Sequence, residues 1–153
     1  MTKPPVTIDE VDRAIIEQLQ TDGRMPYTRL GAKVGMSEAA VRQRVQRLLE
    51  LGAMQVVAVT DPMSLGLRRV AMIGVKTEGD VRRVADAMST FDEVSYLVVT
   101  AGSFDLMAEV VAANDEALLE LINDKVRSIP GVRRTETFVY LQLAKQTYEW
   151  GAR

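Results

Sequence analysis

The spacing of apolar residues changes along this chain, and that change constrains the fold more than any other feature of the sequence. In the first third, apolar residues recur every three or four positions, as in Val11, Ile15 and Leu19, which predicts amphipathic helices. In the rest, short apolar runs bounded by turn residues alternate with helical patterns. Asp61-Pro62 and Gly66 punctuate the segment between these parts. We predict two small domains joined by a strand and linker, with the bounds 1–53, 54–67 and 68–153.

Cap signals place three short helices in the first domain. Thr7-Ile8-Asp9-Glu10 matches a capping box, and Asp22-Gly23 is expected to end the first helix in a left-handed conformation. Pro26 suits the start of the second helix, while Ser37 is the natural N-cap of the third, which Gly52 closes. Three helices in about fifty residues predict a helix-turn-helix.

Two glycines fit the turn between the second and third helices. Gly35 can supply the positive φ of the turn, and Gly31 is expected where the two helices cross closely. The apolar residues expected in the shared core are Leu30, Val34, Met36 and Val41.

Positive charge is concentrated in this first domain, although the whole chain has a formal net charge of -2. Between Arg24 and Leu51 there are six basic residues and only two acidic ones, which predicts a local DNA-binding face. Arg24, Arg29 and Lys33 are expected at phosphates, which position a protein without specifying sequence.

The exposed face of the third helix combines small residues with Arg and Gln, which make bidentate contacts to guanine and adenine edges. Arg44 lies beside the buried stripe, so we expect it in an ion pair with a first-helix acid such as Asp12. The alternative interpretation is a plain three-helix bundle with a solvated basic face. The predicted DNA-binding residues are Arg24, Tyr27, Thr28, Arg29, Ser37, Glu38, Ala39, Arg42, Gln43, Gln46 and Arg47.

The second domain is predicted to be a ferredoxin-like βαββαβ unit, so the chain as a whole belongs to the α+β class. One face of its antiparallel sheet would lack a covering helix, and we expect it to pack against a second subunit. The expected strands are 70–75, 94–100, 104–111 and 132–143, and the expected helices are 80–88 and 115–129.

Composition narrows the function. The chain has no His and no Cys, which removes the commonest general base and any thiolate metal site, so we predict no enzyme, no metal and no cofactor. No apolar run approaches the roughly 18 residues of a membrane span. Met1 to Pro5 lack the apolar core of a signal peptide, and we expect a cytoplasmic protein without a membrane partner.

The chain resembles the Lrp/AsnC (feast/famine) family of transcriptional regulators over nearly its whole length. Each matching piece is short, but their order and spacing are specific. The chain departs from the family pattern at two positions: the family more often has Ala where this chain has Gly31, and Leu where it has Met36. The matching residues are Ile8-Asp9, Asp12, Leu19-Gln20, Asp22-Gly23-Arg24, Val34-Gly35-Met36-Ser37, Val41, Arg44-Val45, Arg47-Leu48, Gly52, Asp61-Pro62, Leu65-Gly66, Gly102-Ser103-Phe104-Asp105, Pro130-Gly131-Val132, Thr135, Thr137 and Lys145.

The resemblance implies a homodimer built through the C-terminal domains, assembled further into tetramers or octamers, and an amino-acid effector bound between subunits. Backbone N–H groups around Gly102 can hold a carboxylate, Asp105 can accept from an ammonium group, and Arg133 is a plausible carboxylate partner. A simple β-turn remains the alternative interpretation of this loop. The effector residues that the resemblance implies are Thr100, Ala101, Gly102, Ser103, Phe104, Asp105, Arg133, Thr135 and Thr137.

The sequence therefore predicts a DNA-binding transcription regulator that responds to an amino acid or a related metabolite. A nucleoid-associated protein that organises the chromosome with little sequence preference is the main alternative, and the modest positive charge of the basic segment disfavours it as a sole role. An enzyme of the same fold is the weakest alternative.

Overall fold

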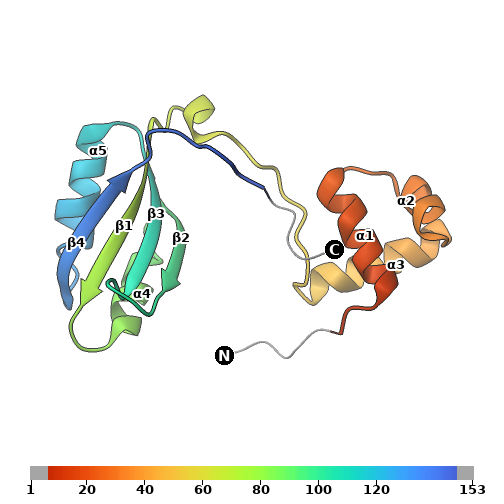
Figure 1. The fold of residues 1–153 in the computed structure, drawn as a ribbon, viewed down its shortest axis with the longest axis horizontal. Helices are drawn as coiled ribbons and strands as arrows, with labels where there is room; N and C mark the ends of the chain where they lie inside the picture. Colours follow the sequence, from red (N-terminus) through yellow and green to blue (C-terminus); the bar gives the residue numbers. More distant parts are fainter. Residues whose placement is uncertain (1–6, 148–153) are drawn as a thin grey trace. The chain divides into compact units, whose positions relative to one another are not determined.

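The structure, a computed structural model, describes residues 7–147. Its chain divides into two compact units, one formed by the segment before Thr60 and the other by Thr60 to Ala144 (Figure 1). Within residues 7–147, no helix is long and apolar enough to cross a membrane.

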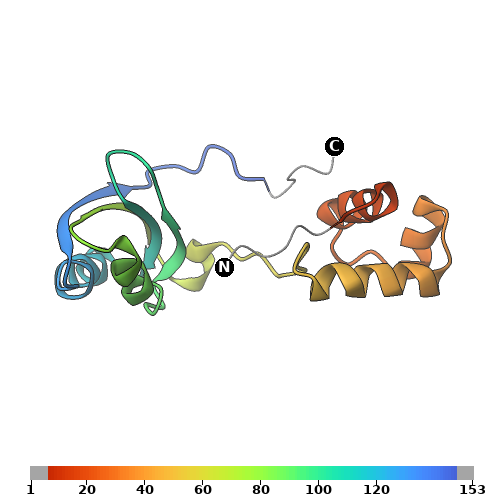
Figure 2. The same cartoon turned by 90° about the horizontal axis from the view of Figure 1, so that it is seen from below.

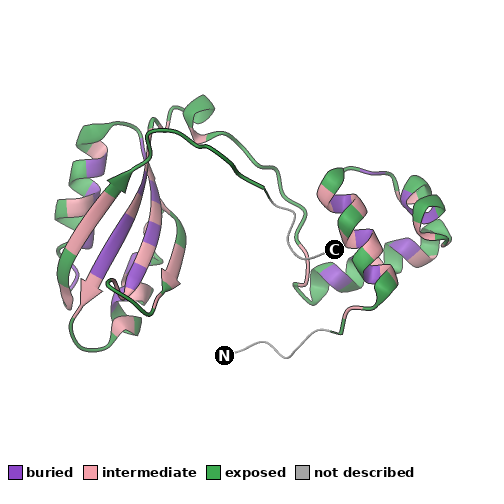
Figure 3. Cartoon of the chain, viewed as in Figure 1, coloured by how far each residue is buried: buried purple, intermediate pink, exposed green. Residues whose placement is uncertain are grey.

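The first unit is the predicted three-helix domain. Its helices are α1 (Glu10–Thr21), α2 (Tyr27–Val34) and α3 (Glu38–Glu50). Figure 3 shows that each helix turns a stripe of buried residues toward the other two. Of the four expected core residues, Leu30 and Val41 are fully buried, whereas Val34 and Met36 are half-buried. The buried apolar residues are Ile15, Leu19, Met25, Leu30, Val41, Val45 and Leu48.

The turn between α2 and α3 is built as its glycines suggest. Gly35 ends α2 with φ 69°, in the left-handed region where a side chain is strained. Gly31 lies against the turn itself, because a Cβ added there would be 2.5 Å from the Met36 carbonyl oxygen. The Ser37 hydroxyl accepts from the Ala40 N–H at 3.3 Å and so caps α3 as predicted.

The two ends of α1 differ from the prediction. The capping box joins Asp9 and Asp12, not Thr7 and Glu10: the Asp9 carboxylate accepts from the Asp12 N–H at 2.8 Å, and Asp12 accepts from the Asp9 N–H at 3.3 Å. At the other end Asp22 is extended, with φ -144°, and the following Gly23 has no positive φ. The Asp22 carboxylate accepts from the Arg24 N–H. This side-chain hydrogen bond forms the turn that Gly23 was expected to form.

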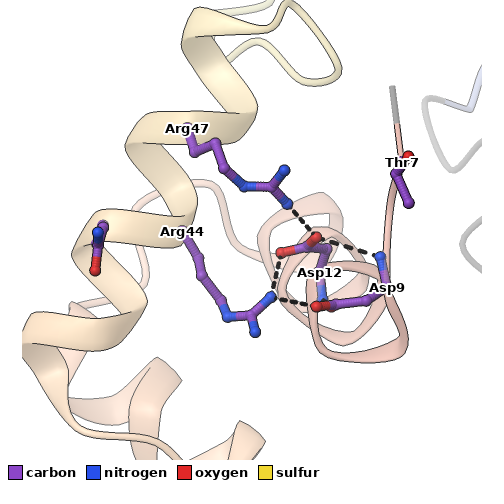
Figure 4. A pocket seen from close by; sticks show the side chains of 6 residues that line it. Thr7, Asp9, Asp12, Arg44 and Arg47 are labelled. Atoms are coloured by element: carbon purple, nitrogen blue, oxygen red, sulfur yellow. Dashed lines mark hydrogen bonds and ion pairs between the residues drawn. The ribbon is translucent and has the colours of Figure 1, made fainter. Parts of the chain in front are cut away.

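Asp12 also ties α1 to α3. Its carboxylate is fully buried, accepts from Arg44 Nη1 at 2.9 Å through Oδ1, and forms an ion pair with Arg47 through Oδ2 (Figure 4). Arg44 Nη1 also donates to Asp9 Oδ2 at 2.6 Å. The expected pair between Arg44 and Asp12 is therefore confirmed. The backbone N–H of Asp12 and then the Arg44 guanidinium hold the pKa of Asp9 below its ordinary value.

The segment 54–67, predicted as a strand and linker, holds no strand in the structure. Residues 54–60, expected to form one, are extended, but no described strand pairs with them. Asp61 then caps a short 3-10 helix, Pro62–Leu65, by accepting from the Met63 N–H at 3.1 Å. An extended apolar segment becomes a strand only where a neighbouring segment offers backbone partners, and among residues 7–147 none does.

The second unit is the predicted ferredoxin-like βαββαβ domain. Its sheet has the antiparallel order β2-β3-β1-β4. Both helices lie on one face of the sheet (Figure 2). The last strand ends well before Leu143, where it was expected to end. The elements are β1 (Arg69–Thr77), α4 (Val81–Met88), β2 (Val94–Val99), β3 (Leu106–Ala112), α5 (Asp115–Glu120) with a π-helical continuation (Leu121–Val126), and β4 (Val132–Val139).

Gly31→Ala tests the tight turn. We expect the free energy of unfolding of the first unit to fall by about 1–3 kcal/mol, because the added methyl group would press on backbone that cannot swing away. The result runs against helix propensity, which favours alanine by about 1 kcal/mol. Urea unfolding followed by circular dichroism at the helical band measures it. Gly23→Ala is the control, since its Cβ would meet nothing closer than 3.6 Å, and equal losses in the two variants would contradict the packing argument.

Asp12→Ala tests the link between α1 and α3. We expect the first unit to lose about 2–3 kcal/mol, less than for a fully buried ion pair because both guanidinium groups keep some contact with water. The same urea titration applies, with Glu17→Ala as a control that removes an exposed acid from the same helix. A loss no larger than that of the control would show that the network contributes nothing to stability.

Candidate nucleic-acid interface and effector loop

One face of α3 is free of the helical core. The spacing of three and four residues brings its side chains into one line, and they border a shallow groove on the protein surface. The residues that line the groove are Ala39, Arg42, Gln43, Gln46, Arg47 and Glu50. All are exposed, so the predicted base-reading residues of α3 do share one accessible surface.

The long side chains of this face are held by neighbours. Arg42 Nη2 lies 2.8 Å from Glu38 Oε1, and the Arg42 guanidinium lies over the Tyr27 ring, 5.2 Å from its centroid. Gln46 Nε2 donates to Glu50 Oε1 at 3.1 Å. These contacts restrict the rotamers of Arg42 and Gln46, so binding of a partner to this face would cost these side chains less conformational entropy.

Arg44 and Arg47 are constrained differently. Both guanidinium groups point toward Asp12 on α1, as Figure 4 shows, and the Arg47 side chain remains 43% exposed. Arg47 was predicted to contact DNA, and no local pattern indicated its ion pair with Asp12. Held in this way, it keeps donors for a phosphate but has little freedom to follow a base edge.

The remaining predicted DNA contacts lie on or beside α2. Arg24, Thr28 and Arg29 are exposed. Tyr27 is half-buried against the helical core, and the face of its ring contacts the Arg42 guanidinium. Lys33 donates to Gln18 Oε1 at 2.6 Å.

In the second unit, the predicted effector loop joins β2 to β3. It is closed by hydrogen bonds of its own: the Thr100 N–H donates to the Asp105 carbonyl at 2.9 Å, and the Thr100 hydroxyl donates to the Phe104 carbonyl at 2.7 Å. Ala101, Gly102 and Ser103 form the exposed tip. No hydrogen bond within residues 7–147 engages their backbone N–H groups, which leaves them available to an anion.

Asp105 anchors the loop to β1. Its Oδ1 accepts from Lys76 Nζ at 2.7 Å, while its Oδ2 accepts from the Thr77 N–H at 2.7 Å and the Thr77 hydroxyl at 3.1 Å. The Lys76 ammonium, followed by the Thr77 N–H, lowers the pKa of Asp105. Lys76, which was not predicted from the sequence, holds the carboxylate that was expected to accept from an effector.

Phe104 lies on the sheet face opposite the helices. Its ring covers Gly74, where a Cβ would be 2.7 Å from the ring atoms, and meets Phe138 edge to face with 6.2 Å between centroids. Thr135 and Thr137 pair with Val75 and Ile73 and therefore point to the other face, toward the helices. One protomer thus does not bring the loop phenylalanine and the β4 threonines together.

A second basic side chain that was not predicted from the sequence, Arg127, contacts the first part of β4. The Thr135 hydroxyl accepts from Arg127 Nε at 2.9 Å, and Arg127 Nη1 donates to Asn123 Oδ1 at the same distance. Arg133 is exposed, near the place where Val132 pairs with Thr77. The end of the sheet that carries the effector loop is therefore rich in basic groups.

The helix-free face of the sheet is largely apolar. Such a surface in water is unfavourable and marks an interaction site. It includes a polar pair, because the Tyr140 hydroxyl donates to Glu109 Oε2 at 2.9 Å. Desolvation and then this carboxylate raise the pKa of Tyr140 to about 12. The other apolar residues of this face are Val70, Met72, Tyr96, Val98, Phe104, Met107, Val111 and Phe138. The strand registers also place Lys76, Arg134 and Glu136 on this face, near the end that carries the β2–β3 loop.

Within the described residues, no group of three or more metal-ligating side chains is placed to hold an ion. The described residues present an exposed groove along α3, an exposed loop between β2 and β3, and an apolar sheet face.

Comparison with known proteins identifies both units. An AsnC-type helix-turn-helix domain matches residues 8–49, and the dimeric alpha+beta barrel domain at the C-terminus of AsnC-type regulators matches residues 67–153. The HTH-type transcriptional regulator FL11 of Pyrococcus horikoshii is 33% identical over 146 residues, which cover 94% of this chain and 96% of that protein.

Solved structures agree with these matches. Escherichia coli AsnC has a TM-score of 0.82 at 25% identity, over 92% of this chain and 97% of that one. A Neisseria meningitidis transcriptional regulator in complex with L-methionine has a TM-score of 0.83 at 24% identity, over 93% and 95% of the two chains. The chain belongs to the Lrp/AsnC family of transcriptional regulators.

Proposed function

We propose that this regulator binds operator DNA sequence-specifically and that an amino acid bound between subunits of its C-terminal domain changes that binding. The observation that carries the proposal is the exposed face of α3, where Arg42, Gln43 and Gln46 stand in one line on a helix fastened to α1. We propose no catalytic role. Action on chromosomal DNA would place the protein in the cytoplasm, at the nucleoid.

The groove of α3 suits the major groove of DNA. Small residues in its first turn allow close approach, and Arg42 and Gln43 offer the donors that guanine and adenine edges accept. Arg24 and Arg29 stand near α2 for phosphate contacts. Two-fold pairing of protomers through the apolar sheet face would give operators two half-sites, about one helical turn or a multiple of it apart.

The effector loop suits the carboxylate of an amino acid. The exposed N–H groups around Gly102 and Ser103 would hold the carboxylate, and the ligand's ammonium group would compete with Lys76 for Asp105. Arg133, Thr135 and Thr137 would complete the site from a neighbouring subunit. The L-methionine found in a structure of the same fold supports an amino acid as the ligand class. Binding at a subunit junction can alter assembly into tetramers or octamers, and with it the spacing of the DNA-binding units.

Gly102 supports this site independently. It has no positive φ, and a Cβ added there would meet nothing within 4 Å. The protomer itself therefore gives no reason for glycine at the tip of the loop, whereas a ligand or neighbouring subunit that approaches the backbone closely would.

The first experiment is a fluorescence-anisotropy titration at physiological salt with DNA from upstream of the protein's own gene. We expect tighter binding than to a shuffled duplex, and Arg42→Ala should reduce that preference by about 5- to 150-fold because a bidentate base contact is lost. Arg13→Ala removes an exposed charge from α1 and is the control. Equal weak binding to both duplexes would instead support a chromosome-organising protein.

Gly102→Val tests the effector loop. The variant should unfold at the same urea concentration as the wild type, because its side chain points into open space. An equimolar mixture of amino acids that shifts operator affinity of the wild type should no longer shift that of the variant. If the shift survives unchanged, the effector does not approach this part of the backbone.

A further inference from the structure

An acidic residue lies at the N-terminal end of the surface that we propose for DNA binding. Glu38 is the first residue of α3, and its side chain is 44% exposed beside Arg42. A carboxylate among phosphates is unfavourable, so its presence calls for a reason. Part of the reason is structural, since an acid in the first turn favours the helix dipole and pairs with a basic residue four positions later. Those effects do not require that the pair lie on the reading face.

The contact between Glu38 and Arg42 puts a donor and an acceptor side by side. Arg42 Nη2 and Glu38 Oε1 are 2.8 Å apart, and the Tyr27 ring supports the guanidinium from α2. The guanidinium has five N–H donors and the carboxylate has several lone pairs, so the ion pair leaves donors and acceptors unused. The pair therefore presents a fixed pattern in which donors are followed by an acceptor.

That pattern complements the major-groove edge of one base pair. A G·C pair shows two acceptors on guanine, N7 and O6, followed by the amino donor of cytosine N4. An A·T pair shows acceptor, donor and acceptor, so its adenine amino group would face the Arg42 donors and its thymine O4 would face the Glu38 carboxylate. The mismatch leaves desolvated groups without partners.

We propose that the intact Glu38–Arg42 ion pair reads a single G·C base pair in each half-site, and that Glu38 excludes DNA that offers A·T there. The inference rests on the proposed function and deepens it, because it names the base pair and makes Glu38 a specificity-determining residue. Its action is partly repulsive, which is how a charged residue can improve selectivity while it lowers affinity for unrelated DNA.

The test is selection of binding sites from a random double-stranded DNA pool by the full-length protein and three variants: Glu38→Ala, Arg42→Ala and Glu17→Ala. Wild type and the control variant Glu17→Ala should enrich one nearly invariant G·C pair per half-site. Glu38→Ala and Arg42→Ala should both relax that same position and keep the preferences at the others. Matching circular dichroism spectra establish that the variants are folded.

Affinity measurements sharpen the test. Replacing the selected G·C pair by A·T should weaken wild-type binding about 5- to 150-fold. The same replacement should weaken Glu38→Ala binding by a factor at least about threefold smaller, because Arg42 alone still favours guanine but the repulsion between Glu38 and thymine O4 is gone. Glu38→Ala should also bind shuffled DNA more tightly than the wild type does. Two results would overturn this inference without affecting the proposed function. One is that Glu38→Ala keeps the base-pair preference of the wild type, and the other is that Glu38→Ala and Arg42→Ala relax different positions of the site. Failure of the wild type to enrich any sequence would overturn the proposed function as well.

Discussion

The buried carboxylate of Asp12 is the interaction on which the DNA-binding unit depends. Helices α1 and α3 are joined by an apolar core, but apolar contacts alone fix the rotation of a short helix poorly. One carboxylate oxygen of Asp12 forms an ion pair with Arg44 and the other with Arg47. The Asp12 backbone N–H also donates to the side chain that caps α1. The direction in which α3 faces solvent is therefore set by charged, directional contacts. The exposed line of Arg42, Gln43 and Gln46 follows from that orientation.

The same principle separates the two roles of arginine on α3. Arg44 and Arg47 point inward to an acid of another helix, and Arg42 points outward to an acid of its own helix. An arginine held by a buried acid is a structural element that still presents charge to solvent. An arginine held by an exposed acid of its own helix is oriented while its remaining donors stay accessible, and this arrangement is the basis of the role in base recognition that we propose for Arg42.

The fold was predictable from sequence because its signals are local. Apolar spacing, the Gly35 turn and the Ser37 cap are read within a few residues, and the order of strands and helices fixes the topology of the second unit. The capping box was misplaced because Thr7/Glu10 and Asp9/Asp12 have the same spacing, and only Arg44, 32 residues from Asp12, favours the second. Lys76 and Asp105 are 29 residues apart, so no local pattern links them. The segment 54–60 has the composition of a strand but no described backbone partner.

The hydrogen bond between Tyr140 and Glu109 has a consequence for whatever covers the apolar sheet face. An apolar surface alone tolerates sliding, because one methyl group replaces another at small cost. A carboxylate enclosed without partners costs far more, so a covering surface must preserve this hydrogen bond and offer polar groups where the pair lies. Glu109 and Tyr140 therefore set the register in which a second surface can pack along the strands, while the surrounding apolar side chains determine its affinity.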